Sequence, residues 1–278
     1  MLLVLDVGNS NTVLGLYTAG NDGRYSKLIA NWRVATVKTQ TVDEYGVLFH
    51  NLFARDGLQA TKVRGIIISS VVPPMDSTLR EVCEQQFHLE PIFVEPGTRT
   101  GMPVKTDNPA EVGADRIVNC VAALERYGAP AIVVDFGTAT TFDVISEKGE
   151  YLGGAIAPGI GISADALFSR AARLHRVDIK QPKGSVIGKN TISHMQIGLY
   201  YGYIGLVDGI LERMLKELGG KATVVATGGL ATLIAGGSKF IAKVDDQLTL
   251  EGLRILWERN HEPEAKTKPA RPPKKKSV

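Results

Sequence analysis

Two short segments of the chain carry the residue types from which phosphate-binding loops are built. Near the start, an apolar run ends in Asp6, and Gly8 and several small amide and hydroxyl residues follow it. At mid-chain a second apolar run ends in Asp135, followed by Gly137 and several threonines. A carboxylate can hold Mg²⁺ directly or through water, and glycine lets backbone N–H groups approach a phosphate. We therefore interpret both segments as phosphate loops.

The same Asp-x-Gly pattern also occurs in ordinary β-hairpin turns, which is the alternative interpretation of either segment alone. Its recurrence in matching contexts favours two duplicated lobes, each with one loop, that face each other across a nucleotide cleft.

A third segment, Gly228-Gly229, follows a predicted strand and opens a predicted helix. Paired glycines at a helix N-terminus let a flat ligand lie against the backbone. A tight strand-to-helix turn is the alternative for this segment.

The segment 107–116 lies at the predicted junction of the two lobes and ends in Gly113-Ala114-Asp115-Arg116. An Asp beside an Arg is usually a surface ion pair. Gly113 and Ala114, however, permit a substrate to approach closely. An Asp near an alcohol can orient the hydroxyl and take its proton during phosphoryl transfer, so Asp115 is the candidate base.

Two other nucleotide-binding motifs are absent or weak. Gly188-Lys189-Asn190 is the nearest approach to a Walker A sequence, but it lacks the upstream glycine and the Ser/Thr after the lysine. The segment 159–164 matches the dinucleotide fingerprint, with Asp178 at about the expected distance. Pro158 makes that turn looser, and Asp178 lies in a Lys/Pro-rich loop. These two departures from the fingerprint disfavour a dinucleotide site.

Composition excludes several classes of protein. A length of 278 residues suits about two domains. No apolar run approaches the ~18 residues of a membrane helix, and the first residues lack the basic region of a signal peptide. Cys83 and Cys120 are far apart and in no metal-binding pattern, which favours a reduced cytosol. We therefore expect a cytoplasmic protein with no membrane partner.

The formal net charge of +3 comes from the C-terminal end. Residues 261–278 carry six Lys/Arg against two Glu, which leaves the rest of the chain at −1. The proline-rich, apolar-poor composition predicts a disordered basic tail over residues 259–278. A folded region so close to electrical neutrality is not typical of a nucleic-acid binder, so we expect no nucleic acid as a partner.

Hydrophobic periodicity predicts the same order of elements in both halves. The first half is expected to form strands at 2–5, 12–18 and 28–34, a helix at 41–57, a strand at 63–69, a helix at 73–87 and a strand at 91–94. After a linking helix at 117–127, the second is expected to form strands at 131–136, 141–146 and 151–157, helices at 160–173 and 191–218, a strand at 224–226, a helix at 230–234, a strand at 240–244 and a helix at 250–258.

Three strands followed by alternating helix and strand, given twice, resemble the RNase H-like lobes of the actin, hexokinase and Hsp70 superfamily. The expected fold is therefore α/β, with two duplicated RNase H-like (actin-like ATPase) lobes and a nucleotide cleft between them. We expect the first lobe at residues 1–116 and the second, with a dimer helix, at 117–258. In that superfamily ATP lies between the lobes, and a Gly-Gly like Gly228-Gly229 contacts the adenosine.

The motifs taken together resemble those of type III pantothenate kinases over about residues 1–257. They occur in the family's order: Asp6–Ser10, Asp107-Asn108-Pro109, Gly113–Arg116, Asp135–Thr141, Gly153–Gly159 and Gly188–Thr191. The resemblance implies ATP-dependent phosphorylation of pantothenate to 4′-phosphopantothenate, the first step of coenzyme A biosynthesis. It also implies a homodimer that needs Mg²⁺ and a monovalent cation, K⁺ or NH₄⁺.

The resemblance also assigns roles to residues of this chain. Asp115 would be the catalytic base, Asp135 would bind the monovalent cation, and Thr138 would contact a phosphate. Pantothenate would be bound by Gly113, Ala114, Asp115, Arg116 and Thr191. The phosphates, and Mg²⁺ through Asp6, would be held by Asp6, Val7, Gly8, Asn9, Ser10, Asn11, Thr12 and Val13.

One position departs from the family pattern. Before Asp107-Asn108-Pro109 the family commonly has a Tyr that contacts pantothenate, whereas this chain has Thr106. We expect the change to affect the affinity for pantothenate more than the phosphoryl-transfer step itself. Two other functions are kept beside the main one: another sugar or acid kinase of the superfamily, and a nucleotide-dependent regulatory protein.

The predicted helix at 191–218 carries a wide apolar face, which a monomer would expose unless the second lobe covers it. We expect this face to pair with a second copy and to bring Thr191 near the acceptor pocket. The face consists of Ile192, Met195, Leu199, Tyr203, Leu206 and Val207.

Overall fold

The computed structural model of the chain describes residues 1–21 and 23–261. Residues 259–261, predicted as the start of a disordered tail, are the last residues of a helix, and the rest of that predicted tail lies outside the described residues. The strands are β1 (Leu2–Val7), β2 (Asn11–Ala19), β3 (Tyr25–Ala35), β4 (Gly65–Ser70), β5 (Ile92–Phe93), β6 (Ala131–Phe136), β7 (Ala139–Ile145), β8 (Tyr151–Pro158), β9 (Thr223–Thr227) and β10 (Lys243–Val244). The α-helices are α1 (Val42–Arg55), α2 (Asp76–Phe87), α3 (Ala114–Tyr127), α4 (Ile160–Arg170), α5 (Thr191–Glu217), α6 (Ala231–Ala235) and α7 (Leu248–His261).

The two halves of the chain form sheets of the same topology. The first sheet has the order β3-β2-β1-β4-β5, and the second has the order β10-β9-β6-β7-β8. In each, the first three strands form an antiparallel meander and the fourth and fifth run parallel to the first. The order 3-2-1-4-5 is therefore repeated, which confirms the predicted duplication of an α/β lobe.

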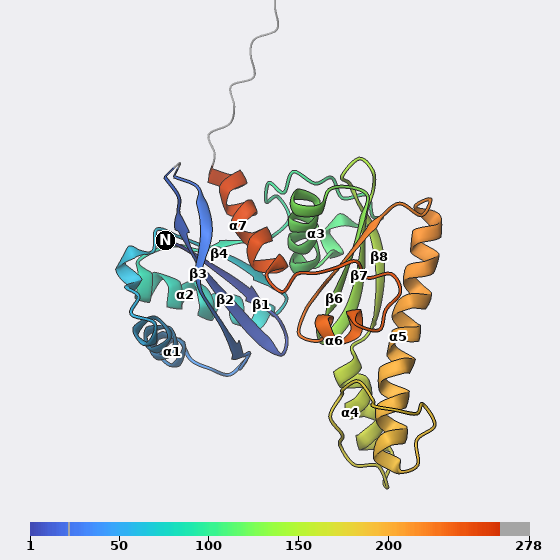
Figure 1. Cartoon of the computed structure of the whole chain (residues 1–278). Helices are drawn as coiled ribbons and strands as arrows, with labels where there is room; N and C mark the ends of the chain where they lie inside the picture. Colours follow the sequence, from blue (N-terminus) through green and yellow to red (C-terminus); the bar gives the residue numbers. More distant parts are fainter. Residues whose placement is uncertain (22, 262–278) are drawn as a thin grey trace, which may run out of the picture.

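Helices fill the space between the sheets and cover their outer faces (Figure 1). One hydrophobic cluster joins the inner faces of both sheets through α3 and α7. A second lies between the first sheet and the helices α1 and α2. A third lies between the second sheet and the helices α5 and α6. The chain thus forms two lobes that share a central layer made of α3 and α7.

Strand alternation places the two loop carboxylates on facing surfaces. Leu2 and Val4 of β1 belong to the central cluster, whereas Leu3 and Leu5 belong to the outer one. Because side chains alternate along a strand, Asp6 continues the inner face. In β6, Ala131 and Val133 are inner and Ile132 and Val134 are outer, so Asp135 also continues the inner face.

Several element boundaries differ from the sequence prediction, and those of β10 and α3 differ most clearly. A strand is expected at 240–244, but β10 has only Lys243 and Val244. The amides of Phe240 and Ile241 donate instead to the hydroxyl of Ser238, so they are not free to join the sheet. The linking helix α3 begins at Ala114 and therefore includes Asp115 in its first turn.

The last helix, α7, packs against α3 and against β1 and β4 of the first sheet. It follows the second lobe in sequence and lies between the two lobes in space (Figure 1). The domain limits 1–116 and 117–258 remain a prediction. Among the described residues, no helix combines the length and the apolar character needed to cross a membrane.

The apolar face predicted for α5 is divided in the structure. Tyr203 and Val207 are buried against the second sheet, and Met195 is buried near the start of the helix. Tyr203 also bonds through its hydroxyl to Thr140 and donates to the carbonyl of Pro158. Ile192 and Leu206 remain exposed, so only part of the predicted face is available to a partner.

Candidate active site

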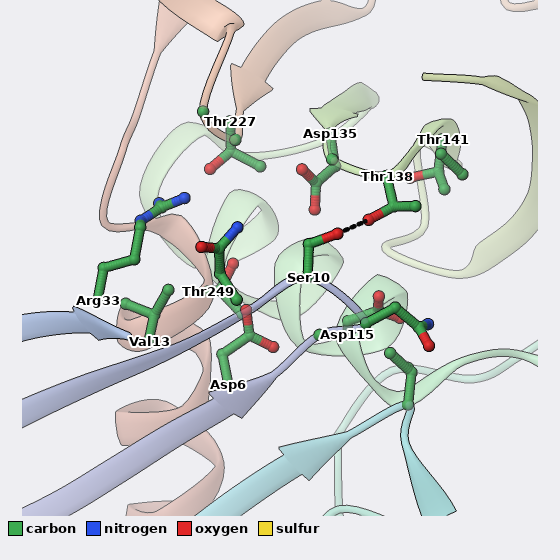
Figure 2. Close-up of a pocket in the computed structure, with 18 of the residues that line it drawn as sticks. Asp6, Ser10, Val13, Arg33, Asp115, Asp135, Thr138, Thr141, Thr227 and Thr249 are labelled. Carbon is green, nitrogen blue, oxygen red and sulfur yellow. Dashed lines mark hydrogen bonds between the residues drawn. The ribbon is translucent and has the colours of Figure 1, made fainter. Parts of the chain in front are cut away.

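A cleft of about 230 Å³ lies where the strands β1 and β6 end, between the two lobes. Asp6, Asp115 and Asp135 line it, each from a different element (Figure 2). The predicted loop residues Gly8, Ser10 and Thr138 and the pair Gly228-Gly229 line it as well. The structure therefore brings together residues that are far apart in the sequence.

The two phosphate loops have similar backbone geometry. The Gly8 amide donates to the Asn11 carbonyl at 3.0 Å, and the Gly137 amide donates to the Ala139 carbonyl at 3.0 Å. Within residues 1–21 and 23–261, the amides of the loop residues between them make no hydrogen bond to a backbone carbonyl. Those N–H groups are available to an anion at the edge of the cleft.

The tips of the two loops touch. The hydroxyls of Ser10 and Thr138 lie 2.9 Å apart and form a hydrogen bond between the lobes (Figure 2). This hydrogen bond lies at the point where the tips of the two loops meet. A phosphate group bound there would accept from both hydroxyls and replace the direct bond.

Two residues of the predicted phosphate loop face away from the cleft. Val7 and Thr12 are fully buried and belong under the loop. The Thr12 hydroxyl lies 2.9 Å from that of Thr36, which donates to the Gly8 carbonyl at 2.7 Å. The side chains of Val7 and Thr12 therefore support the loop instead of reaching a ligand, because strand alternation turns them to the outer face of the first sheet.

Burial and neighbouring carboxylates raise the pKa of two carboxylates of the cleft, those of Asp6 and Asp135. Burial, followed by the charges of Asp115 and Asp135, raises the pKa of Asp6 well above its usual value. Burial and the charge of Asp115 raise the pKa of Asp135 to about 7. Arg33 and a hydrogen bond from Asn119 oppose part of this increase. The cluster is therefore short of positive charge, which suits a cation-binding site.

Among the described residues, no three His, Cys, Asp or Glu side chains are placed to ligate one metal ion on their own. Protein carboxylates here could complete a coordination shell only together with water or with phosphate oxygens. Mg²⁺ sites in nucleotide-binding enzymes commonly have that composition.

Asp115 is held by the start of α3. Its Oδ1 accepts from the Arg116 amide at 2.8 Å. A Cβ at Gly113 would lie 2.7 Å from that same oxygen, so a larger residue there would displace the carboxylate. Burial raises the pKa of Asp115, although Arg116 lowers it in part.

The guanidinium of Arg116 is engaged elsewhere. Its Nε and Nη2 both lie 2.7 Å from Oδ1 of Asp143, whose side chain is fully buried. Tyr151 donates to the same oxygen at 2.8 Å, and Thr141 donates to Oδ2 at 3.0 Å. Asp143 therefore fixes Arg116 beside Asp115 and keeps the two from forming a direct ion pair.

Gly228 fits its position for two reasons. Its φ of +94° lies in a region that residues with a side chain rarely adopt. A Cβ there would also lie 2.6 Å from Oδ1 of Asp135 and 2.7 Å from the backbone of Phe136. The pair Gly228-Gly229 thus forms a flat wall of the cleft directly against Asp135.

Thr191 does not reach the cleft within this chain. It lies at the first turn of α5, in a separate cavity with Leu167, His194 and Met195. This end of α5 projects away from the lobes beside α4 (Figure 1). The cleft of its own chain therefore does not account for its predicted contact with pantothenate.

Comparison with known proteins agrees with this architecture. A family model described as type III pantothenate kinase matches residues 2–213. The chain belongs to the type III pantothenate kinase family. A type III pantothenate kinase of Koribacter versatilis is 68% identical over 94% of this chain and 96% of its own length. Another, from Acidobacterium capsulatum, is 57% identical over 93% of this chain and 94% of its own length.

Solved structures share the fold of this family member at low identity. A protein provisionally named 2-dehydro-3-deoxygalactonokinase from Sinorhizobium meliloti is 14% identical, with a TM-score of 0.59 over 95% of this chain and 98% of its own. A conserved protein provisionally named a Baf family transcriptional activator from Campylobacter jejuni is 20% identical, with a TM-score of 0.56 over 93% and 98% of the two chains. Both likenesses concern the fold alone.

Three charged side chains at or near the cleft of this family member were not predicted from the sequence. Arg33 and Asp246 line the cleft, and Asp143 holds Arg116 beside it. The signal for Asp143 was its position two residues after Thr141 on a strand that leaves the second loop. Arg33 lies next to Trp32 in a strand whose register is not evident from the sequence.

Proposed function

We propose that this chain transfers the γ-phosphoryl group of ATP to the primary hydroxyl of pantothenate, with Asp115 as the base. Family membership supports pantothenate phosphorylation, the first step of coenzyme A biosynthesis. The observation that carries the mechanism is the placement of Asp115 in the same cleft as the two phosphate loops. Its pKa is raised by burial, which makes the carboxylate a stronger base.

The loops would hold the triphosphate in line with the acceptor. The Ser10 and Thr138 hydroxyls, now bonded to each other, would both turn to phosphate oxygens. The backbone N–H groups beside them would add further donors. Such fixed donors stabilise the charge that develops on the transferred group at little reorganisation cost.

The residues of the cleft fit the cations implied by the family. Asp6 would hold Mg²⁺ together with the phosphates, and Asp135 would hold K⁺ or NH₄⁺. When bound, these cations supply positive charge against the triphosphate. Asp6 and Asp135 have pKa values raised by burial and by neighbouring carboxylates, as expected of carboxylates short of a counter-charge.

The cation assignment is tested by exchanging the salt. Activity should collapse when Na⁺ or Tris replaces K⁺, and an Asp135→Ala variant should lose the response to K⁺. Equal rates of the native protein in all salts would contradict the assignment.

We further propose that the enzyme acts as a homodimer whose acceptor pocket contains Thr191 of the second copy. Gly113, Ala114 and Arg116 would complete that pocket next to Asp115. The exposed part of α5 supports this assembly, since Ile192 and Leu206 are 59% and 36% exposed. The glycines between them on α5 have open space where a Cβ would lie, so a second helix could approach closely.

Charged substitutions at Ile192 and Leu206 test the assembly. They should give a monomer that binds ADP normally and pantothenate poorly. Tyr203 is unsuitable for this test, because it is buried in its own lobe. A fully active monomer in sedimentation at assay concentration would reject the proposal.

The state of the two cysteine thiols is consistent with a cytoplasmic location. Cys83 and Cys120 are both free and buried. Burial raises the pKa of each thiol, so neither is reactive at neutral pH. Free thiols of this kind are typical of a reducing compartment.

The activity itself is tested by product formation. Purified protein with ATP, Mg²⁺ and K⁺ should form ADP only when pantothenate is present. Mass spectrometry should find one phosphopantothenate for each ADP. ADP formation that is independent of pantothenate would contradict the proposal.

A further inference from the structure

The register of the first sheet places a basic residue in the same row as Asp6. Asp6 of β1 pairs with Val13 of β2, and Val13 pairs with Arg33 of β3. Residues directly opposite each other in neighbouring strands point to the same face of the sheet. Arg33 therefore shares the inner face that carries Asp6, two strands farther along.

Arg33 projects into the cleft. It is exposed, lines the same cavity as the three aspartates, and reaches toward the end of β9 near Thr227 (Figure 2). A Cβ at Gly229 would lie 3.6 Å from its Nη1. A side chain from the first lobe thus faces the Gly228-Gly229 wall of the second.

The guanidinium has no direct partner in the part of the chain that the structure describes. No hydrogen bond or ion pair joins it to residues 1–21 or 23–261. Four carboxylates line the cleft, those of Asp6, Asp115, Asp135 and Asp246. An unpaired cation among them gives an anionic ligand one attractive site away from the loop tips.

We propose that Arg33 binds the α-phosphate of ATP and thereby joins the two lobes through the nucleotide. The inference rests on ATP being the phosphoryl donor, as proposed above. The planar fork of a guanidinium matches two phosphate oxygens, and such charge-assisted bonds are stronger than neutral ones.

Position decides which phosphate Arg33 contacts. The γ-phosphate must lie near Asp115 for transfer, beside the contact of Ser10 and Thr138. Arg33 stands on the other side of Asp6 from Asp115, next to Gly228-Gly229 (Figure 2). The part of ATP that reaches Arg33 is therefore the end of the triphosphate nearest the nucleoside.

Calorimetric binding of ADP to four proteins tests the proposal: the native chain, Arg33→Gln, Arg33→Lys and the control Lys27→Gln. Lys27 is an exposed cation on the same strand that does not line the cleft. Arg33→Gln should weaken ADP binding about 10- to 100-fold, as expected for loss of charge-assisted bonds. Arg33→Lys should fall between, because it retains the charge without the fork, and Lys27→Gln should bind as the native chain does.

Two results would overturn the proposal. One is native affinity in Arg33→Gln. The other is an equal loss in Arg33→Gln and Arg33→Lys, which would indicate stacking on the base or a structural role. Kinetics with both substrates add a check: KM for ATP should rise in Arg33→Gln while KM for pantothenate stays the same.

The binding measurement is independent of the acceptor. If the native chain bound ADP but phosphorylated no pantothenate, the proposed function would fail and the Arg33 test would still stand. If Arg33→Gln bound ADP normally while the native chain phosphorylated pantothenate, only the Arg33 proposal would fail.

Discussion

The two lobes carry the same carboxylate at the same point of the same topology, with different residues beside it. In the first lobe the row across the sheet reads Ser69, Asp6, Val13 and Arg33. In the second lobe the corresponding row reads Thr227, Asp135, Thr141 and Ile156. The row position that Arg33 occupies in the first lobe is therefore occupied in the second by Ile156, whose side chain is 65% exposed.

The loops after the fourth strand of each lobe differ as well. After β9 the second lobe has Gly228-Gly229, whereas after β4 the first lobe has Val71-Val72-Pro73. Arg33 faces the glycines, and Val71 lines the cleft near Gly113 and Asp115. In the proposed function, the side of the cleft at Gly228-Gly229 takes the nucleotide and the side at Asp115 takes the alcohol.

Removal of the proposed base, Asp115, should have the largest effect on activity. Asp115→Asn should cut kcat by about 10²–10⁴, the usual contribution of a positioned general base. ADP affinity should stay near native, because Asp115 lies on the acceptor side. Native turnover in the variant, measured by coupled ADP release, would show that another group takes the proton.

Adding a methyl group to the glycine wall should affect the nucleotide side. Gly228→Ala should weaken ADP binding about tenfold or more, since the new Cβ is strained at positive φ and displaces the Asp135 carboxylate. The control is Gly161→Ala, whose Cβ would have nothing within 4 Å and which does not line the cleft. Equal losses in the two variants would contradict the assigned role of Gly228.

Loosening Arg116 should affect the acceptor side. Asp143→Asn removes the buried charge that fixes the guanidinium, and KM for pantothenate should rise about tenfold. KM for ATP should change little. Tyr151→Phe is the milder control, because Asp143 would keep its bonds from Arg116 and Thr141. A rise confined to KM for ATP would show that Asp143 acts on the nucleotide side of the cleft, which would contradict this prediction.

The ligand-free protein should show the smallest effect, in its stability as a function of pH. The folded-state pKa of Asp135 is raised to about 7 from 3.8, so between these values the folded state binds more protons than the unfolded state. Stability should therefore fall as pH rises from about 4 to about 7. Asp135→Asn should reduce this dependence and raise Tm at pH 7.5 by several degrees, measured without nucleotide or metal.

Much of the fold followed from the sequence because its signals are local. Apolar runs ending in Asp6 and Asp135 marked the central strands, and the helix predicted from residue 41 begins at a capping box formed by Thr41 and Glu44. The duplicated order followed from these elements. The packing of α7 across the first sheet could not be predicted, since its apolar residues would fit either lobe.

The candidate site was predictable where its residues are consecutive in sequence. Arg33 was not, because the hairpin that joins β2 to β3 has register shifts at Leu16/Tyr17 and Thr18/Ala19. Each shift changes which residue lies opposite Val13. The position of Thr191 also needed the structure, because only the direction of α5 shows that it projects away from its own cleft.

The division of the cleft into two half-sites is tested most directly by a crystal structure of the chain with ADP, Mg²⁺ and pantothenate. The phosphates should lie between Ser10 and Thr138, with the nucleoside against Gly228-Gly229 and the α-phosphate on Arg33. The primary hydroxyl of pantothenate should lie within hydrogen-bond distance of Asp115. A nucleoside bound instead on the side of Asp115 and Val71, with pantothenate beside Arg33, would contradict the account.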